Sequence, residues 1–441
     1  MIVSRLSLKE KTSLEKIVAG IYLKFHPDFS LKRAYLIGIQ QISLKFKFRG
    51  GNVMKKYLFL VISLALIMAI VLSGCRTKEL GTIKIGFFAP LTGFAASDGE
   101  SVLNSAKLAV ETINNAGGLL GKKIELVDYD DNCNSDQAVS IAQKLIASDK
   151  VVAVVSGSYS NPTRAVAPIF QSAKIPMVSS YAEHPDITKA GDYIFRQSFV
   201  GSIQGRAGAE IAVRKIGAKK IAILQVDNDF GASLADSFRE HAKDLGGEVI
   251  SFDKFQIGEK EFNPLLTRIK KENPDLIYMV AYYEEGSQIM KQMKQLEMNT
   301  KVLGTEGIDS TKGFFEIVGK DAEGLVFTTN LNRDDSRKVT QDYIKNYTEK
   351  YGFAPDMVGA SAYDSFMVLA EAIRISGQAT SDAIKDGMYK IKDFDAVTGV
   401  ISSYNKLGEV LKPVQVQTVK NGEIHFFDEI TDTKVITPPD I

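Results

Sequence analysis

The stretch VVAVVSGSYSNPT, from Val151 to Thr163, contains three patterns in 13 residues. Its first six residues are almost continuously apolar and β-branched, which is typical of a strand buried on both faces of a parallel sheet. A polar loop follows, and a helix is predicted to begin near Asn161. Because open parallel sheets bind their ligands beyond the carboxyl ends of the strands, this loop is a candidate binding segment.

The same alternation of apolar strand and amphipathic helix extends in both directions. Upstream, TIKIGFF and KIELVDY are predicted strands, each followed by a helical pattern. After YIFRQSF the pattern restarts with KKIAILQV, EVISFDKF, DLIYMVA and KVLG. Near the end of the chain, turn residues at Asn421 and Gly422 predict antiparallel strands. The predicted class is α/β with two lobes, each a parallel sheet flanked by helices.

The segment MKKYLFLVISLALIMAIVLSGC, from Met54 to Cys75, has the pattern of a secretory signal. Two lysines precede an apolar run of 16 residues, and small residues come before the cysteine. Because this run is shorter than the roughly 20 residues of a membrane-spanning helix, a cleaved signal is favoured over a permanent anchor. The ending is similar to the lipobox of bacterial lipoproteins, so residues 54–74 are the expected signal peptide and Cys75 the lipidated residue. A buried core helix is the alternative.

Residues 1–53 precede this signal and would hinder its use by the export machinery. They include LSLKEKTSLEKIVAGIYLKF, which could form an amphipathic helix, but no apolar partner segment follows it. Met54 is therefore the expected true start. Residues 1–53 are predicted to be an artefactual extension, disordered or marginally helical, and residues 75–81 a linker after the lipidated cysteine.

Composition excludes some classes of function. The 441 residues include 54 basic and 53 acidic side chains; residues 1–53 hold 10 basic and 3 acidic ones, and the signal two more basic ones. The remaining 42 basic and 50 acidic residues give the mature chain a net charge of −8. An acidic chain without basic clusters is a poor nucleic-acid binder. With only Cys75 and Cys133 present, no disulfide framework is expected.

Motifs of catalysis are nearly absent. The segment GGLLGKK, from Gly117 to Lys123, lacks the first glycine and the Ser/Thr of a phosphate-binding loop, so it is interpreted as a turn that ends a helix. No G-x-S-x-G, H-E-x-x-H or C-x-x-C motif occurs, and the four histidines have no metal-ligand spacing. The sequence therefore predicts no enzyme, no metal and no cofactor.

Six polar segments follow predicted strands: APLTGFAASDG, SGSYSNP, SSYAEHP, DNDFG, AYYEEG and GTEG. Three come from each predicted lobe, so together they predict a cleft between the lobes that closes on a small polar molecule. Taken singly, each segment could be an ordinary polar loop with a helix-capping residue.

These segments, with AVETINNAGGLLGKKIELVDYDD and IPMVSSYAEHPDIT, carry a resemblance over about Ile83–Phe427. The chain resembles the leucine/isoleucine/valine-binding family, the periplasmic binding proteins that serve ABC importers of branched-chain amino acids. The resemblance implies a hinged, bilobed receptor without catalysis. Residues 82–201 and about 325–400 would form lobe 1, and about 202–324 and 401–441 lobe 2.

The resemblance also implies ligand-binding positions. The cradle for the ligand carboxylate falls on Ser160 and on the backbone near Tyr181 and Ala182. Ser160 can cap the helix predicted at Asn161, whose N-terminus favours an anion. The acid for the ligand ammonium matches Glu306, and its aromatic neighbour matches Tyr282. A solvated loop acid at Glu306 and plain packing at Tyr282 are the alternatives.

Some positions depart from the pattern of the family. Glu183 stands where a threonine is usual, Asp98 replaces an aromatic residue, and Phe230 replaces tyrosine, with the further acid Asp229 before it. Four acids around one cleft disfavour an anionic ligand unless arginines neutralise them. The candidate arginines are Arg164, Arg196 and Arg206. A cysteine that would pair with Cys133 is replaced by Tyr159.

Three classes of function remain in competition. The leading one is a monomeric, lipid-anchored, extracytoplasmic receptor that delivers an amino acid to ABC permease and ATPase subunits. The second has the same fold and binds an amide, urea-like or aromatic ligand. The third is a sensory module that acts on a signalling partner. A cytoplasmic α/β enzyme is the most distant alternative, and nucleic acid is not an expected partner.

Overall fold

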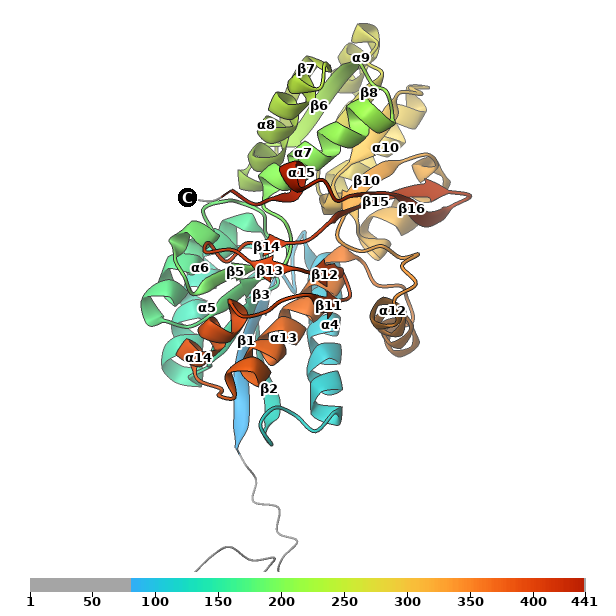
Figure 1. Ribbon diagram of the computed structural model, residues 1–441. Helices are drawn as coiled ribbons and strands as arrows, with labels where there is room; N and C mark the ends of the chain where they lie inside the picture. Colours follow the sequence, from blue (N-terminus) through green and yellow to red (C-terminus); the bar gives the residue numbers. More distant parts are fainter. Residues whose placement is uncertain (1–80, 440–441) are drawn as a thin grey trace, which may run out of the picture. The chain divides into compact units, whose positions relative to one another are not determined.

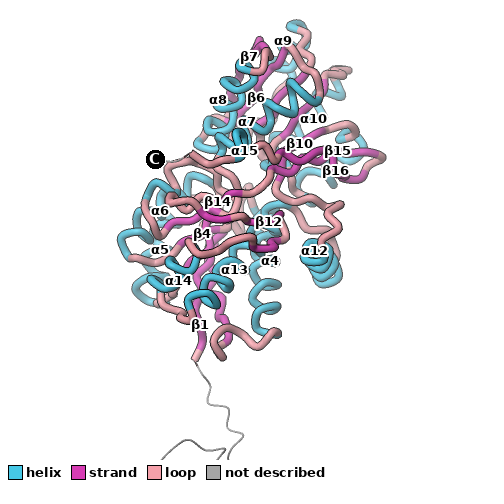
Figure 2. Tube along the Cα trace, viewed as in Figure 1, coloured by secondary structure: helices cyan, strands magenta, loops and turns pink. Residues whose placement is uncertain are grey.

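The computed structural model describes residues 81–439 (Figures 1 and 2). The expected signal peptide, Cys75 and residues 1–53 lie outside the described residues. Within residues 81–439, no helix has the length and apolar character needed to cross a membrane.

The first lobe is built on a five-stranded parallel sheet with the order β2-β1-β3-β4-β5. Its strands are β1 (Thr82–Ala89), β2 (Lys123–Asp130), β3 (Ala153–Ser156), β4 (Met177–Ser179) and β5 (Ile194–Arg196). The helices of this lobe are α4 (Ala96–Asn115), α5 (Ser135–Lys144), α6 (Ser160–Ala173), α12 (Lys338–Tyr351), α13 (Met357–Ser376) and α14 (Ser381–Met388).

Alternate residues of β1 fill the cores on the two faces of this sheet. Phe87 packs against Phe366 of α13, with ring centroids 6.1 Å apart. Its neighbour Phe88 lies in the opposite core with residues of α5 and α6. Because both faces are covered, the strands are continuously apolar, as the sequence predicts.

The second lobe contains a seven-stranded sheet with the order β16-β15-β10-β9-β8-β6-β7. Its parallel strands are β6 (Lys220–Val226), β7 (Glu248–Phe255), β8 (Leu276–Val280), β9 (Lys301–Gly304) and β10 (Val326–Thr329). Two antiparallel strands, β15 (Val414–Lys420) and β16 (Glu423–Ile430), extend it at one edge. Its helices are α7 (Gly201–Ala209), α8 (Asp229–Asp244), α9 (Asn263–Glu272), α10 (Tyr283–Gln295), α11 (Glu316–Val318) and α15 (Thr433–Ile436).

The chain passes between the two lobes three times: at residues 197–200, 330–337 and 412–413. Polar contacts tie these crossing segments together. The side-chain amide of Asn330 donates a hydrogen bond to Ser198 Oγ at 2.7 Å. The buried ammonium group of Lys412 donates to Thr398 Oγ1 at 2.7 Å and lies 5.3 Å from the ring centroid of Phe199.

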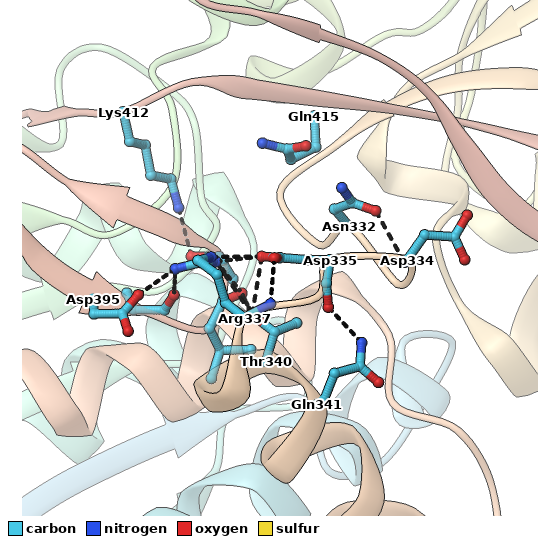
Figure 3. A network of polar contacts seen from close by, with 12 residues as sticks. Asn332, Asp334, Asp335, Arg337, Thr340, Gln341, Asp395, Lys412 and Gln415 are labelled. Atoms are coloured by element: carbon cyan, nitrogen blue, oxygen red, sulfur yellow. Dashed lines mark hydrogen bonds and ion pairs between the residues drawn. The ribbon is translucent and has the colours of Figure 1, made fainter.

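Arg337 holds the second crossing segment against the first lobe (Figure 3). Its guanidinium group donates to Asp335 at 2.7 Å and to the main-chain oxygen of Ala396 at 2.8 Å. It also pairs with Asp395 of the small antiparallel sheet formed by β11 (Phe394–Ala396) and β12 (Gly399–Ile401). One side chain therefore links α12 to the strands that precede the third crossing.

The structure differs from the predicted lobe boundaries at two places. Residues 325–400 are predicted in lobe 1, but β10 pairs with β9 and β15 in the second sheet. Residues 401–441 are predicted in lobe 2, but the small sheet of β13 (Ser403–Tyr404) and β14 (Val410–Leu411) lies against the first. Tyr404 packs against Phe195 of β5, and the fully buried Arg196 of β5 pairs with Glu409 at 2.9 Å.

Candidate functional site

A cavity between the two lobes is lined by segments that follow the carboxyl ends of β1, β3, β4, β6, β8 and β9. The lining residues are Asp98, Tyr159, Ser160, Tyr181, Ala182, Phe230, Tyr282, Glu306, Gly307, Met357 and Val358. Its volume is about 20 Å³, which holds about one water molecule. The lobes are therefore closed on each other in this conformation.

Stacked aromatic rings join the lobes across this cavity. Tyr282 of the second lobe lies between Tyr159 and Phe230, at ring centroid distances of 4.4 Å and 5.0 Å. The Tyr159 and Tyr282 planes differ by 10°, so their faces are in contact. A molecule larger than water does not fit in this cavity, so its entry requires the rings of Tyr159 and Tyr282 to separate.

Gly307 allows the loop after β9 to approach the loops after β6 and β8. A Cβ atom at Gly307 would lie 2.4 Å from the main-chain oxygen of Ala281 and 3.1 Å from the ring of Phe230. The first of these distances is shorter than any real contact of a Cβ atom. Gly307 therefore lets Glu306 lie next to the aromatic stack.

Ser160 is the first residue of α6, not the cap that the sequence predicts. Its hydroxyl accepts a hydrogen bond from the backbone N–H of Glu183 at 3.2 Å. A side-chain cap would need Ser160 one position before the helix, where Tyr159 lies instead. Even so, Ser160 lines the cavity at the positive end of the helix dipole, where an anionic group is favoured.

Two buried carboxyl groups meet across the lobes. Glu183 is fully buried and Glu306 is 3% exposed, and their carboxyl groups are close enough for the charge of Glu306 to act on Glu183. Two like charges buried close together are unfavourable, so a proton on one of the two carboxyl groups is favoured. Burial raises the pKa of Glu306 to about 7, and burial together with the charge of Glu306 raises the pKa of Glu183 well above its ordinary value. Glu183 Oε1 also accepts a hydrogen bond from Gln204 at 2.7 Å.

Asp98 provides a third carboxyl group at the cavity. It lies in the first turn of α4 and is 3% exposed. Its Oδ2 accepts a hydrogen bond from the hydroxyl of Tyr159 at 2.8 Å, whereas its Oδ1 has no hydrogen-bond partner among residues 81–439. Burial, followed by the nearby charge of Asp356, raises the pKa of Asp98 to about 8.

The structure brings seven of the nine sequence-predicted residues together in the lining: Asp98, Ser160, Tyr181, Ala182, Phe230, Tyr282 and Glu306. Glu183 is not in the lining, but its backbone N–H donates to Ser160 Oγ at 3.2 Å and its carboxyl group lies near Glu306. Asp229 is not in the lining, because its carboxylate pairs with Arg164 at 2.7 Å.

Four lining residues were not predicted: Tyr159, Gly307, Met357 and Val358. Tyr159 and Gly307 lie inside predicted binding loops, so the loop pattern identified their neighbourhood but not their roles. Met357 and Val358 open α13, whose apolar sequence indicates only a core helix. The buried N-cap Asp356 is the one signal that this helix begins near a polar site.

The arrangement of the lobes and the cavity defines a class of protein. Two α/β lobes connected by three crossing segments enclose a small cavity, and loops at the carboxyl ends of both sheets line it. These are the features of a receptor that encloses a small ligand by movement of its lobes.

The chain belongs to the periplasmic binding protein family, whose model matches residues 82–423. It is 30% identical over 341 residues to the Leu/Ile/Val-binding protein of Citrobacter freundii, covering 75% of this chain and 90% of that one. A branched-chain amino acid transporter substrate-binding protein from Streptococcus pneumoniae, solved with isoleucine, has a TM-score of 0.73 at 31% identity, with 79% of this chain and 99% of that one covered. A solute-binding protein from Rhodopseudomonas palustris, solved with 3,4-dihydroxybenzoic acid, has a TM-score of 0.72 at 26% identity, with 79% and 97% covered. The resemblance inferred from the sequence is thus confirmed, and so is the predicted fold class.

Proposed function

We propose that this chain is the extracytoplasmic solute-binding component of an ABC importer and that its ligand is an amino acid. The observation that carries the proposal is the placement of Ser160 and Glu306 in one cavity. Ser160 begins a helix whose N-terminus favours a carboxylate, and Glu306 has an oxygen atom without a hydrogen-bond partner among the described residues, which an ammonium group could satisfy. This pair of opposite requirements is the pattern of an amino-acid zwitterion.

Closure of the lobes would deliver the ligand in an enclosed form. The three crossing segments act as the hinge in this proposal, and the lobes separate to admit the ligand between Tyr159 and Tyr282. The protein works without catalysis or cofactor. It acts as a monomer, and the permease and ATPase subunits of the importer are its partners.

A thermal-shift screen tests this function. Purified protein is heated with each of the amino acids, with amides and with aromatic acids. A ligand at 100 times its Kd adds about 2.7 kcal/mol to the apparent free energy of unfolding. Stabilisation by one or more amino acids supports the proposal. Stabilisation by aromatic acids or amides alone would contradict it.

The second candidate ligand is an aromatic acid or an amide. The aromatic stack of Tyr159, Tyr282 and Phe230 favours it, since a planar ligand could lie between such rings. The dihydroxybenzoic acid complex of the Rhodopseudomonas palustris protein shows that a protein of similar fold binds such a ligand. The acids Glu306 and Asp98 argue against an aromatic anion, because no basic side chain lines the described cavity.

Export and anchoring complete the proposal. Residues 54–74 act as the signal peptide and Cys75 carries the lipid that holds the protein at the membrane, with translation starting at Met54. Cys75→Ser should abolish acyl labelling and release the protein from membranes. Unchanged membrane association of this variant, or peptides from residues 1–53 in the purified protein, would contradict this part.

A further inference from the structure

The charged side chains that line the cavity are all acidic. Asp98 and Glu306 line it, and neither lysine nor arginine occurs among its described lining residues. Asp98 Oδ1 and Glu306 Oε2 are both buried without a hydrogen-bond partner in the part of the chain that the structure describes. An unsatisfied buried carboxylate oxygen is costly, so both atoms call for a donor from the ligand.

The arginines that could neutralise these acids are engaged elsewhere. Arg164 pairs with Asp229 at 2.7 Å, outside the lining. Arg196 pairs with Glu409 at 2.9 Å and donates to the main-chain oxygen of His184 at 2.8 Å. Arg206 donates to the main-chain oxygen of Val435 at 2.7 Å. A positive charge that stabilises the ionised forms of Asp98 and Glu306 would therefore come from the ligand.

The aromatic residues of the lining also favour a positively charged ligand. Tyr159, Tyr181, Phe230 and Tyr282 all line the cavity beside the carboxyl groups. The faces of such rings attract cations, and aromatic rings with acids are a recurrent way to bind ammonium groups. Tyr159 contacts both an acid and another aromatic ring, since its hydroxyl donates to Asp98 and its face stacks on Tyr282.

The ionised forms of Glu306 and Asp98 would each be stabilised by a separate cationic group of the ligand. Burial next to Glu183 disfavours the ionised form of Glu306, and the α-ammonium of an amino acid would supply the counter-charge that stabilises it. Asp98, on α4 of the first lobe, likewise has no basic side chain beside it in the lining, so burial favours its protonated form until a cation stabilises the ionised one. An apolar side chain such as that of leucine would bury Asp98 Oδ1 without a donor, whereas a basic side chain would supply both donor and charge.

We propose that the ligand is a basic amino acid, with its α-ammonium at Glu306 and its side-chain cation at Asp98, flanked by Tyr159 and Tyr282. This inference rests on the proposed function and narrows its ligand class. It identifies Asp98 as the residue that determines specificity for the side chain.

Calorimetric titration with matched ligands tests the inference on the parent protein. L-norleucine has the four-carbon chain of L-lysine without the ammonium group, so the pair isolates the charge; L-ornithine and L-arginine vary its position. The tightest of the three basic amino acids should bind at least about 30-fold more tightly than L-norleucine and L-leucine. Equal or tighter binding of L-leucine or L-norleucine would overturn the inference and leave the proposed function intact. Binding of no amino acid would overturn both.

Two variants assign the effect to one side chain. Asp98→Asn retains the shape of the side chain and removes the charge, so the preference for the basic amino acid should fall to within about threefold. The matched control Asp229→Asn makes the same change in an acid that is paired with Arg164 outside the lining, and the preference should persist. A preference that survives Asp98→Asn would overturn the assignment to Asp98.

Discussion

Glu306→Gln separates a ligand-binding role from a purely structural one. The substitution conserves the volume of the side chain and removes the charge that would balance a ligand ammonium. Loss of one partner of a buried charge pair costs about 2–5 kcal/mol, which is roughly 30-fold to several-thousand-fold in Kd. Glu306 is 3% exposed and has an oxygen without a hydrogen-bond partner among the described residues. The free-energy cost of a buried pair therefore applies to it, and not the smaller cost of a surface ion pair.

The same substitution should not harm the ligand-free protein. Burial raises the pKa of Glu306 from 4.5 to about 7. The ionised carboxylate therefore destabilises the folded state relative to the unfolded chain at neutral pH. Glutamine avoids this cost and can donate a hydrogen bond to Glu183. The melting temperature without ligand should therefore stay level or rise.

Calorimetry and thermal unfolding of both proteins with the ligand found in the screen decide the matter. The expected result is a melting temperature that stays level or rises without ligand, together with loss of the ligand-induced shift. An affinity within threefold of the parent would remove Glu306 from the site, and with it the main reason to expect an amine. A large drop in the melting temperature without ligand would instead identify Glu306 as a structural residue.

Three further predictions concern stability and motion. Glu409→Gln leaves Arg196 buried without its counter-charge and should lower the free energy of unfolding by about 3–5 kcal/mol in urea titrations, whereas a loss under 1 kcal/mol would refute the structural role of this pair. Because the pKa of Asp98 is raised to about 8, the folded protein binds more protons than the unfolded chain above pH 4, so stability falls as pH rises. Relative to Asp98→Asn, the ligand-free parent should lose about 3 kcal/mol of unfolding free energy between pH 5 and pH 7, and parallel stability curves of the two proteins would contradict this. Solution scattering should give a smaller radius of gyration with saturating ligand than without, and identical profiles would argue against closure.

Much of the fold was predictable because both sheets are buried on two faces. Continuous apolar runs such as Ala153–Ser156 identify the parallel strands, and the turn at Asn421 identifies the final antiparallel pair. The boundaries between the lobes were harder to predict from the sequence. The sequence of β10 resembles any other buried strand, and only its pairing with β15 assigns it to the second sheet. The small sheet around Glu409 contacts the first lobe through the ion pair with Arg196, a contact across 213 residues.

The binding loops were predictable from topology, but the contacts inside them were not. Asp98, Glu306 and Tyr282 all follow strand ends, where a polar residue is conspicuous. The stacking of Tyr159 on Tyr282 joins two lobes and depends on their closure, which no local pattern encodes. Likewise, Asp229 lies in the first turn of a helix that follows a strand, as Asp98 does, but Asp229 pairs with Arg164 outside the cavity.

The three crossings of the chain also govern when the protein can fold. The core around Phe87 of β1 needs Phe366, and the second sheet needs β15 beside β10, so each lobe depends on segments made late in synthesis. At about 5–20 residues per second, roughly 15–70 s separate the synthesis of β1 from that of β15. Throughout that interval the nascent chain has no complete lobe. A chain with this topology therefore completes neither lobe until nearly all of it has been synthesised, so its native fold is reached late in synthesis.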